Sequence, residues 1–132
     1  MREILFRGKD VDTGEWVYGY YSGPVGACEC HEICDTNDVL GSMVDVAPDT
    51  VGQFTGLTDK HGKKIFEGDI VVLTLPAAKM HWRAVCKFHS GAFGLVWHHM
   101  GVERWQAFAA ICNAEYEVIG NIYDNPELAE DE

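Results

Sequence analysis

The chain of 132 residues is poor in positive charge: 10 lysines and arginines stand against 21 aspartates and glutamates, a formal net charge of −11. This charge repels phosphate backbones, so it argues against sequence-independent binding of DNA or RNA. The sequence also lacks a charged leader before an apolar run, and it has no stretch of eighteen apolar residues. We therefore predict a soluble cytoplasmic protein that does not engage a membrane.

Paired cysteines and the common catalytic motifs are lacking too. The five cysteines are an odd number, and no Gly-rich phosphate loop, Walker-type run or nucleophile elbow is present. With 47% apolar residues, a chain of this length can bury one core without bridges or a metal. We expect free thiols in a reducing setting, and one domain over residues 1–132.

Short β-rich runs separated by turn residues fill most of the chain. The expected strands are residues 4–7, 16–21, 51–55, 64–66, 70–75 and 115–123, with a hairpin over 82–97. Residues 22–48 show no sustained period and are expected to form an irregular insertion. Helical spacing of apolar residues predicts one short helix within 103–113, and Asn125-Pro126 predicts a C-terminal helical turn before a frayed acidic tail at 129–132.

The stretch from Ile70 to Leu75 is apolar on both faces. Such a strand is typical of the centre of a barrel, or of a strand covered by another subunit. We predict a mainly β fold of five to eight short strands, curled into a partly open, SH3-like barrel with one or two short helices. Gly56, Gly62 and Gly68 are expected at bends that a β-carbon would obstruct, with Gly62 at positive φ.

Two segments carry a resemblance to a known family. The run from Thr50 to Val71 and the run from Glu117 to Leu128 resemble the YopX-like phage and prophage proteins, and Phe6 to Lys9 with Trp16 to Tyr20 does so more weakly. The resemblance implies a phage or prophage origin, homo-oligomerisation and no assigned reaction.

One cluster has the composition of a metal site: Cys28, Cys30, His31 and Cys34 lie within seven residues. Four such ligands could close around zinc, and His98 or His99 could supply a distant ligand. Structural zinc sites more often pair two separate knuckles, so an irregular loop with reduced thiols is the favoured interpretation, and we assign no metal.

Other side chains could serve catalysis or stacking. Cys34 with His31 or His61 could form a nucleophilic pair. Asp59, Glu67 and Asp69 could act as general acids, bases or magnesium ligands, although Asp59 and Asp69 suit turns better. The aromatic residues Trp16, Tyr18, Tyr20, Trp82, Phe88, Phe93 and Trp97 could stack on bases, but their alternation favours a core or subunit interface.

The composition, the family resemblance and the candidate sites together favour a non-enzymatic, homo-oligomeric protein-binding module, without a cofactor and without assigned catalytic residues. Its partner is expected to be a host or phage protein with a basic surface, because the chain itself is acidic. Two alternatives stay open. One is a metal-dependent or cysteine-based enzyme that uses the loop from Cys28 to Cys34, and the other is a nucleic-acid-binding barrel.

Overall fold

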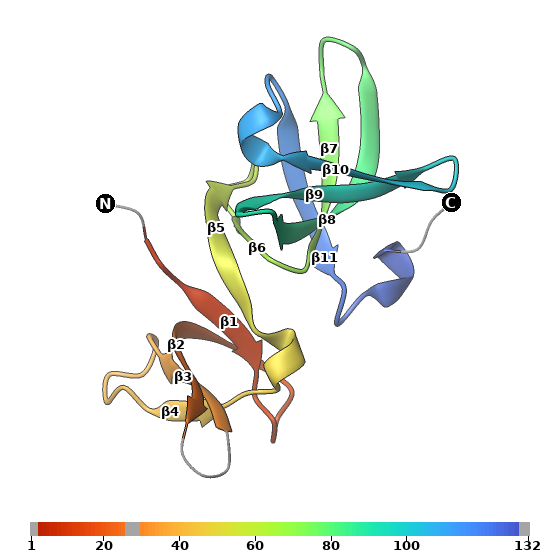
Figure 1. Ribbon diagram of the computed structural model, residues 1–132. Helices are drawn as coiled ribbons and strands as arrows, with labels where there is room; N and C mark the ends of the chain where they lie inside the picture. The colour runs from red at the N-terminus through yellow and green to blue at the C-terminus, as the bar shows by residue number, and fades with distance from the viewer. Residues whose placement is uncertain (1–2, 26–29, 130–132) are drawn as a thin grey trace. The chain divides into compact units, whose positions relative to one another are not determined.

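The computed structural model describes residues 3–25 and 30–129, and the chain divides after residue 56 into two compact units. Both units consist of antiparallel strands joined by short turns (Figure 1). The predicted mainly β class is confirmed. Among the described residues neither sheet closes into a barrel, and the helical segments are three single turns of 3-10 helix.

Unit 1 holds strands in the order β4-β3-β2-β1-β5. The bounds are β1 Phe6–Lys9, β2 Trp16–Val25, β3 Cys30–Asp35, β4 Met43–Asp45 and β5 Gly52–Thr58, with η1 at Pro48–Thr50 before β5. Val17, Ile33 and Val46 form its buried core. The predicted hairpin of the first two strands is confirmed, since Phe6 pairs with Gly19 and Lys9 with Trp16.

The expectation that residues 22–48 form an irregular insertion is wrong where this segment forms strands, at residues 22–25, 30–35 and 43–45. β2 continues to Val25, and β3 and β4 add two further strands to the sheet. In β3 a single apolar side chain, Ile33, is fully buried. One apolar residue among glutamate, histidine and cysteine is too little to show a period of two, so the pairing with β2 decides the structure.

β5 crosses the boundary and forms a hairpin with β6, Lys64–Phe66. The remaining strands of unit 2 form a five-stranded sheet in the order β10-β9-β8-β7-β11. Their bounds are β7 Asp69–Leu75, β8 Met80–His89, β9 Ala92–His99, β10 Val102–Ala107 and β11 Glu115–Asn121, with η2 at Phe108–Ala110 and η3 at Pro126–Ala129. The predicted hairpin over 82–97 is confirmed, with Phe88 opposite Phe93.

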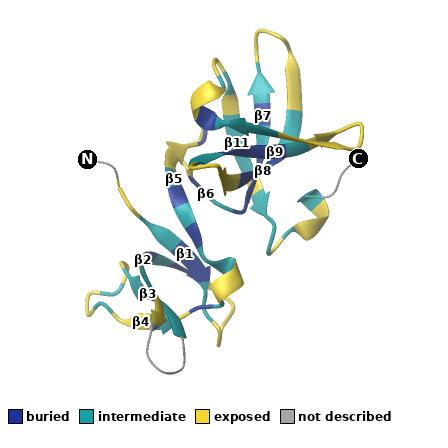
Figure 2. Ribbon diagram, viewed as in Figure 1, coloured by how far each residue is buried: buried dark blue, intermediate teal, exposed yellow. Residues whose placement is uncertain are grey.

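The core of unit 2 lies on one face of this sheet, and its strands carry the dark buried segments of Figure 2. Val71, Leu73, Ala84, Cys86 and Leu95 supply the sheet side of this core, and Ile65 of β6 with Phe108 of η2 covers them.

The expected helix within 103–113 is wrong. Residues 102–107 pair along β9 instead, and the helical spacing survives only as the one turn of η2.

The predicted positive φ at Gly62 is confirmed at +83°, and Gly56 and Gly68 also have positive φ, at +91° and +89°. An added β-carbon would meet a neighbouring atom only at Gly68, since the space at Gly56 and Gly62 is open. Within the described residues, no helix is long and apolar enough to cross a membrane.

Candidate functional site

The sheet of unit 2 has a second face, opposite its core. Side chains alternate along a strand, and residues paired across antiparallel strands point to the same side. Val71 and Leu73 point into the core, so Ile70 and Val72 point the other way. The register carries this face across the sheet, because Ile70 pairs with Val85 and Val85 pairs with Val96.

A groove of about 660 Å³ lies over this face. Apolar side chains of β7, β8 and β9 contribute to its lining, together with residues at the end of the chain. The lining residues are Ile70, Val72, His81, Trp82, Arg83, Ala84, Val85, Lys87, Val96, Trp97, His98, Ile122, Leu128 and Ala129. The groove is therefore bounded by three strands and by the segment through η3.

The described lining of the groove is basic, although the chain as a whole is acidic. Arg83, Lys87, His81 and His98 are among its described lining residues, and no aspartate or glutamate is. Arg83 and Lys87 lie four residues apart on β8 and on the same side of the strand. Arg83 is half-buried and Lys87 is exposed, so the groove presents a guanidinium and an ammonium on an apolar background.

Hydrogen bonds hold the wall formed by η3. The backbone N–H of Asn125 donates to Asn121 O at 2.8 Å, and Asn121 Oδ1 accepts from the N–H groups of Tyr123 and Asp124 at 3.0 and 2.9 Å. The N–H of Ile122 donates to Gly68 O at 2.9 Å, which ties this corner to the entry of β7. Ile122 and Leu128 are in this way fixed beside the sheet.

Acidic residues on neighbouring strands are engaged by histidines of their own. Glu103 Oε1 lies 3.7 Å from His98 Nε2, and Glu117 Oε2 lies 3.1 Å from His61 Nε2. By register, Glu103 pairs with His98 and Glu117 pairs with Val72. Both carboxylates therefore stand beside the groove.

The cysteine and histidine cluster does not form the alternative zinc arrangement in the part that the structure describes. His31 lies on the same side of β3 as buried Ile33, and its Nδ1 is 2.5 Å from the hydroxyl of Tyr21. Cys34 lies on the other side, where its thiol donates to Gly41 O at 3.5 Å. Within residues 3–25 and 30–129, no group of three His, Cys, Asp or Glu side chains could hold a metal ion, and Cys28 lies outside the described residues.

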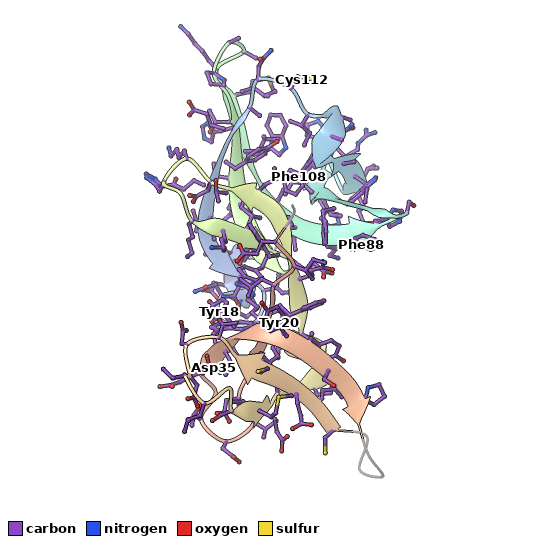
Figure 3. The ribbon with its side chains drawn as sticks, turned by 90° about the vertical axis from the view of Figure 1, so that its left-hand side faces the viewer. Tyr18, Tyr20, Asp35, Phe88, Phe108 and Cys112 are labelled. Carbon is purple, nitrogen blue, oxygen red and sulfur yellow. The ribbon has the colours of Figure 1, made fainter. Side chains whose placement is uncertain are left out.

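The expectation of free thiols is correct at three positions and wrong at one. Cys34, Cys86 and Cys112 form no disulfide, whereas Cys30 is disulfide-bonded. Cys86 is buried in the core of unit 2, and exposed Cys112 lies between η2 and β11 (Figure 3). The proposed pairing of Cys34 with His31 is not formed, because these side chains leave opposite faces of β3. His61 contacts Glu117.

Two candidate acids serve the backbone. Asp59, which is only 7% exposed, accepts hydrogen bonds from the N–H groups of His61 and Lys63 at 2.9 Å each and of Val118 at 3.0 Å. Burial raises the pKa of the Asp59 carboxyl, but these amides and the nearby His61 charge outweigh burial, so the pKa lies below its ordinary value. Buried Asp69 accepts from the N–H of Phe66 at 2.7 Å. Glu67 lies in the same turn.

The aromatic residues divide between core and surface. Trp82, Phe93 and Trp97 pack against the core of unit 2, as predicted. Tyr20 in unit 1 and Phe88 in unit 2 are 63% and 54% exposed (Figure 3). The sequence shows no lysine or arginine interleaved with Trp16, but β1 brings Arg7 to 4.5 Å and Lys9 to 5.4 Å from its ring.

The groove itself was not predicted from the sequence. Its signal is the alternation of His81, Arg83, Val85 and Lys87 along β8, which the sequence shows as the polar side of a hairpin. Of the predicted candidates, only Trp82, Trp97 and His98 line it. The wall at Leu128 comes from a segment some forty residues further along the chain, so only the fold brings the two together.

Comparison with known proteins identifies the fold. The family model described as YopX protein matches residues 5–130. The crystal structure of the YopX protein from Bacillus subtilis is similar, with a TM-score of 0.59 and 21% identity over 96% of this chain and 98% of that one. The crystal structure of protein EF1440 from Enterococcus faecalis has a TM-score of 0.49 and 24% identity over 98% of this chain and 100% of that one. A search of curated proteins finds no match.

Proposed function

The chain belongs to the YopX family, and on the basis of its groove we propose that it is a non-enzymatic protein-binding module. The main support for this proposal is the composition of the groove. Its described lining residues offer apolar side chains, an arginine, a lysine and two histidines, and among them there is no serine, threonine, cysteine or carboxylate. Nucleophilic and acid–base catalysis need a nucleophile beside a base, or a matched acid and base, whereas an apolar floor with a few charges suits recognition.

The engagement of Asp59 and Asp69 supports the same proposal. Both candidate acids accept hydrogen bonds from backbone amides, which stabilise the fold. A carboxylate that is committed to several amides is poorly placed to accept a proton from a substrate.

The proposal includes homo-oligomerisation and an origin in a phage or prophage. Apolar side chains at the ends of the unit 2 hairpins are exposed and are available for contacts between copies: Met80, Phe88, Met100 and Val102. The other face of β7, which the sequence left to a neighbouring subunit, is covered in part by the chain itself, since Ile70 is fully buried. The net charge of −11 favours a partner with a basic surface at long range.

Light scattering combined with affinity capture tests this function. We expect a mass above the 14.7 kDa of one chain at micromolar concentration, and capture of a basic protein from a host lysate that weakens as salt is raised. A heat-denatured sample of the same chain serves as the control for adhesion to exposed apolar surface. A clean monomer that captures nothing beyond this control, and that turns over a metabolite with saturable kinetics, contradicts the proposal.

A further inference from the structure

We infer that the groove of unit 2 binds an extended acidic segment of a partner protein, in which two carboxylates flank an apolar side chain. This inference rests on the proposed function and names the chemistry of the partner at this site. It follows from three properties of the described residues: the charge of the groove, the spacing of its two basic side chains and the apolar floor between them.

The charge of the groove selects an anion. Arg83 and Lys87 supply N–H donors on basic side chains, and no carboxylate is among the lining residues that the structure describes. A chain with a net charge of −11 repels acidic partners at a distance, but salt screens that repulsion beyond about 8 Å, so local charges decide at contact range. An arginine has five N–H donors, and Arg83 can therefore donate to a further carboxylate alongside its other contacts.

The spacing of the cations selects a long ligand. Arg83 and Lys87 are separated by four residues on one strand, or roughly 13 Å at about 3.3 Å per residue. A single phosphate or carboxylate does not reach both. An extended peptide that runs along β8 presents every second side chain to the groove, so carboxylates at positions i and i+4 match the two cations, and position i+2 lies over Val85.

The floor distinguishes a peptide from a nucleic acid. Val85 lies between Arg83 and Lys87 on β8, with Ile70 and Val96 paired to either side of it. Val72 pairs with Arg83, and Leu128 adds an apolar wall. The partly exposed Val72, Val85 and Leu128 offer contact to an aliphatic residue. Single-stranded nucleic acids are instead held by aromatic stacking and a continuous positive track. Burying one medium aliphatic side chain contributes favourably to binding, so position i+2 should be valine, isoleucine or leucine.

The partner is then a protein whose body is basic and which carries one acidic and apolar extended segment. At long range the negative charge of the chain attracts the basic body, and at contact range the groove selects the segment. This combination makes an unstructured acidic tail or an exposed strand the fitting element.

A capped seven-residue peptide with the sequence Thr-Glu-Thr-Val-Thr-Glu-Thr tests the inference. Its matched controls replace both glutamates by glutamine, or move the second glutamate one position closer. We expect amide shifts in β7, β8 and β9 of the isotopically labelled full chain with the test peptide, and affinities about tenfold weaker for both controls. Equal binding of either control overturns the assigned register.

Variants of the chain locate the contact. Lys87→Gln and Arg83→Gln should each weaken the test peptide by about tenfold, whereas Lys79→Gln, an exposed lysine outside the groove, should leave it unchanged. Lys87→Glu should abolish binding, and replacing one glutamate of the peptide by lysine should restore it. A retained amide spectrum shows that each variant is folded. Binding insensitive to all groove variants, or single-stranded DNA shifting the same amides more strongly, overturns the inference.

The outcomes also separate this inference from the function on which it rests. Affinity capture that Arg83→Gln and Lys87→Gln leave intact, with no peptide binding, overturns the groove assignment while the binding function stands. Peptide binding with no captured partner retains the groove and contradicts the wider function.

Discussion

Gly68 and Tyr123 are in direct contact, although 55 residues separate them in sequence: a β-carbon at Gly68 would lie 2.9 Å from Tyr123 Cε2. Gly68 belongs to the first of the two segments that carry the family resemblance, and Tyr123 belongs to the second. The hydrogen bond from Ile122 N–H to Gly68 O joins the same two segments. They therefore act as one corner, which sets the entry of β7 and the wall of the groove.

We predict that Gly68→Ala destabilises the protein for two reasons. Its φ of +89° is unfavourable for alanine, which costs roughly 1–2 kcal/mol, and the new methyl group would crowd the Tyr123 ring. Gly62→Ala is the matched control, because φ there is +83° and no atom lies within 4 Å of the added carbon. Urea unfolding should show a larger loss for Gly68→Ala than for Gly62→Ala. Equal losses of unfolding free energy in the two variants would show that the Tyr123 ring moves aside without destabilising the fold.

Asp59→Asn should lower the free energy of unfolding at neutral pH by about 1–3 kcal/mol. The Asp59 carboxylate accepts hydrogen bonds from three backbone N–H groups, and the NH2 group of an asparagine would face at least one of these donors without an acceptor. The pKa of Asp59 is depressed in the folded state. Its contribution is therefore complete above the unfolded pKa of about 3.9 and is lost as pH falls through the lower folded pKa. Urea unfolding at several pH values should show the difference between wild type and variant shrinking in strong acid.

Glu117→Gln is the control for this effect. It removes the ion pair with His61, but both side chains are well exposed, so the loss should be roughly 0–1 kcal/mol. If Glu117→Gln lowered the free energy of unfolding as much as Asp59→Asn does, the exposed ion pair would stabilise the fold as strongly as the buried carboxylate, and the prediction would be wrong.

The sequence predicts best where local signals agree with the fold. The predicted hairpin over 82–97 turns at Ser90-Gly91, where both residues have positive φ. Met100-Gly101 also has positive φ at both positions, yet the helical spacing from Trp105 to Cys112 outweighed this signal in the prediction of a helix. Pairing of six residues with β9 overrides that spacing. The groove escaped prediction because its floor and its wall come from distant segments.

The cluster at Cys30, His31 and Cys34 should retain no stoichiometric zinc. His31 and Cys34 leave opposite faces of β3, and Cys30 is disulfide-bonded. Elemental analysis after incubation with zinc and desalting checks this, with a chelator-treated sample as the reference. Cys34→Ser should change the free energy of unfolding by no more than about 0.5 kcal/mol, because serine preserves a donor toward Gly41 O. Zinc retained in a one-to-one ratio and lost in Cys34→Ser would restore the metal hypothesis.

The pairing of β10 with β9 predicts a severe effect of Gly94→Ala. A β-carbon at Gly94 would lie 2.3 Å from Gln106 O and 2.7 Å from Ala107 Cα, so the backbone of β10 would have to move. We expect a loss of roughly 2–4 kcal/mol, because strand pairing and the seating of Phe108 in the core depend on this register. Gly91→Ala is the control, since φ there is +81° but the space around an added β-carbon is open. The only loss of stability expected there comes from backbone strain at positive φ. Hydrogen exchange should show faster exchange of the β10 amides in Gly94→Ala alone. If residues 103–113 formed a helix away from β9, Gly94→Ala would be tolerated and those amides would exchange as in the wild type.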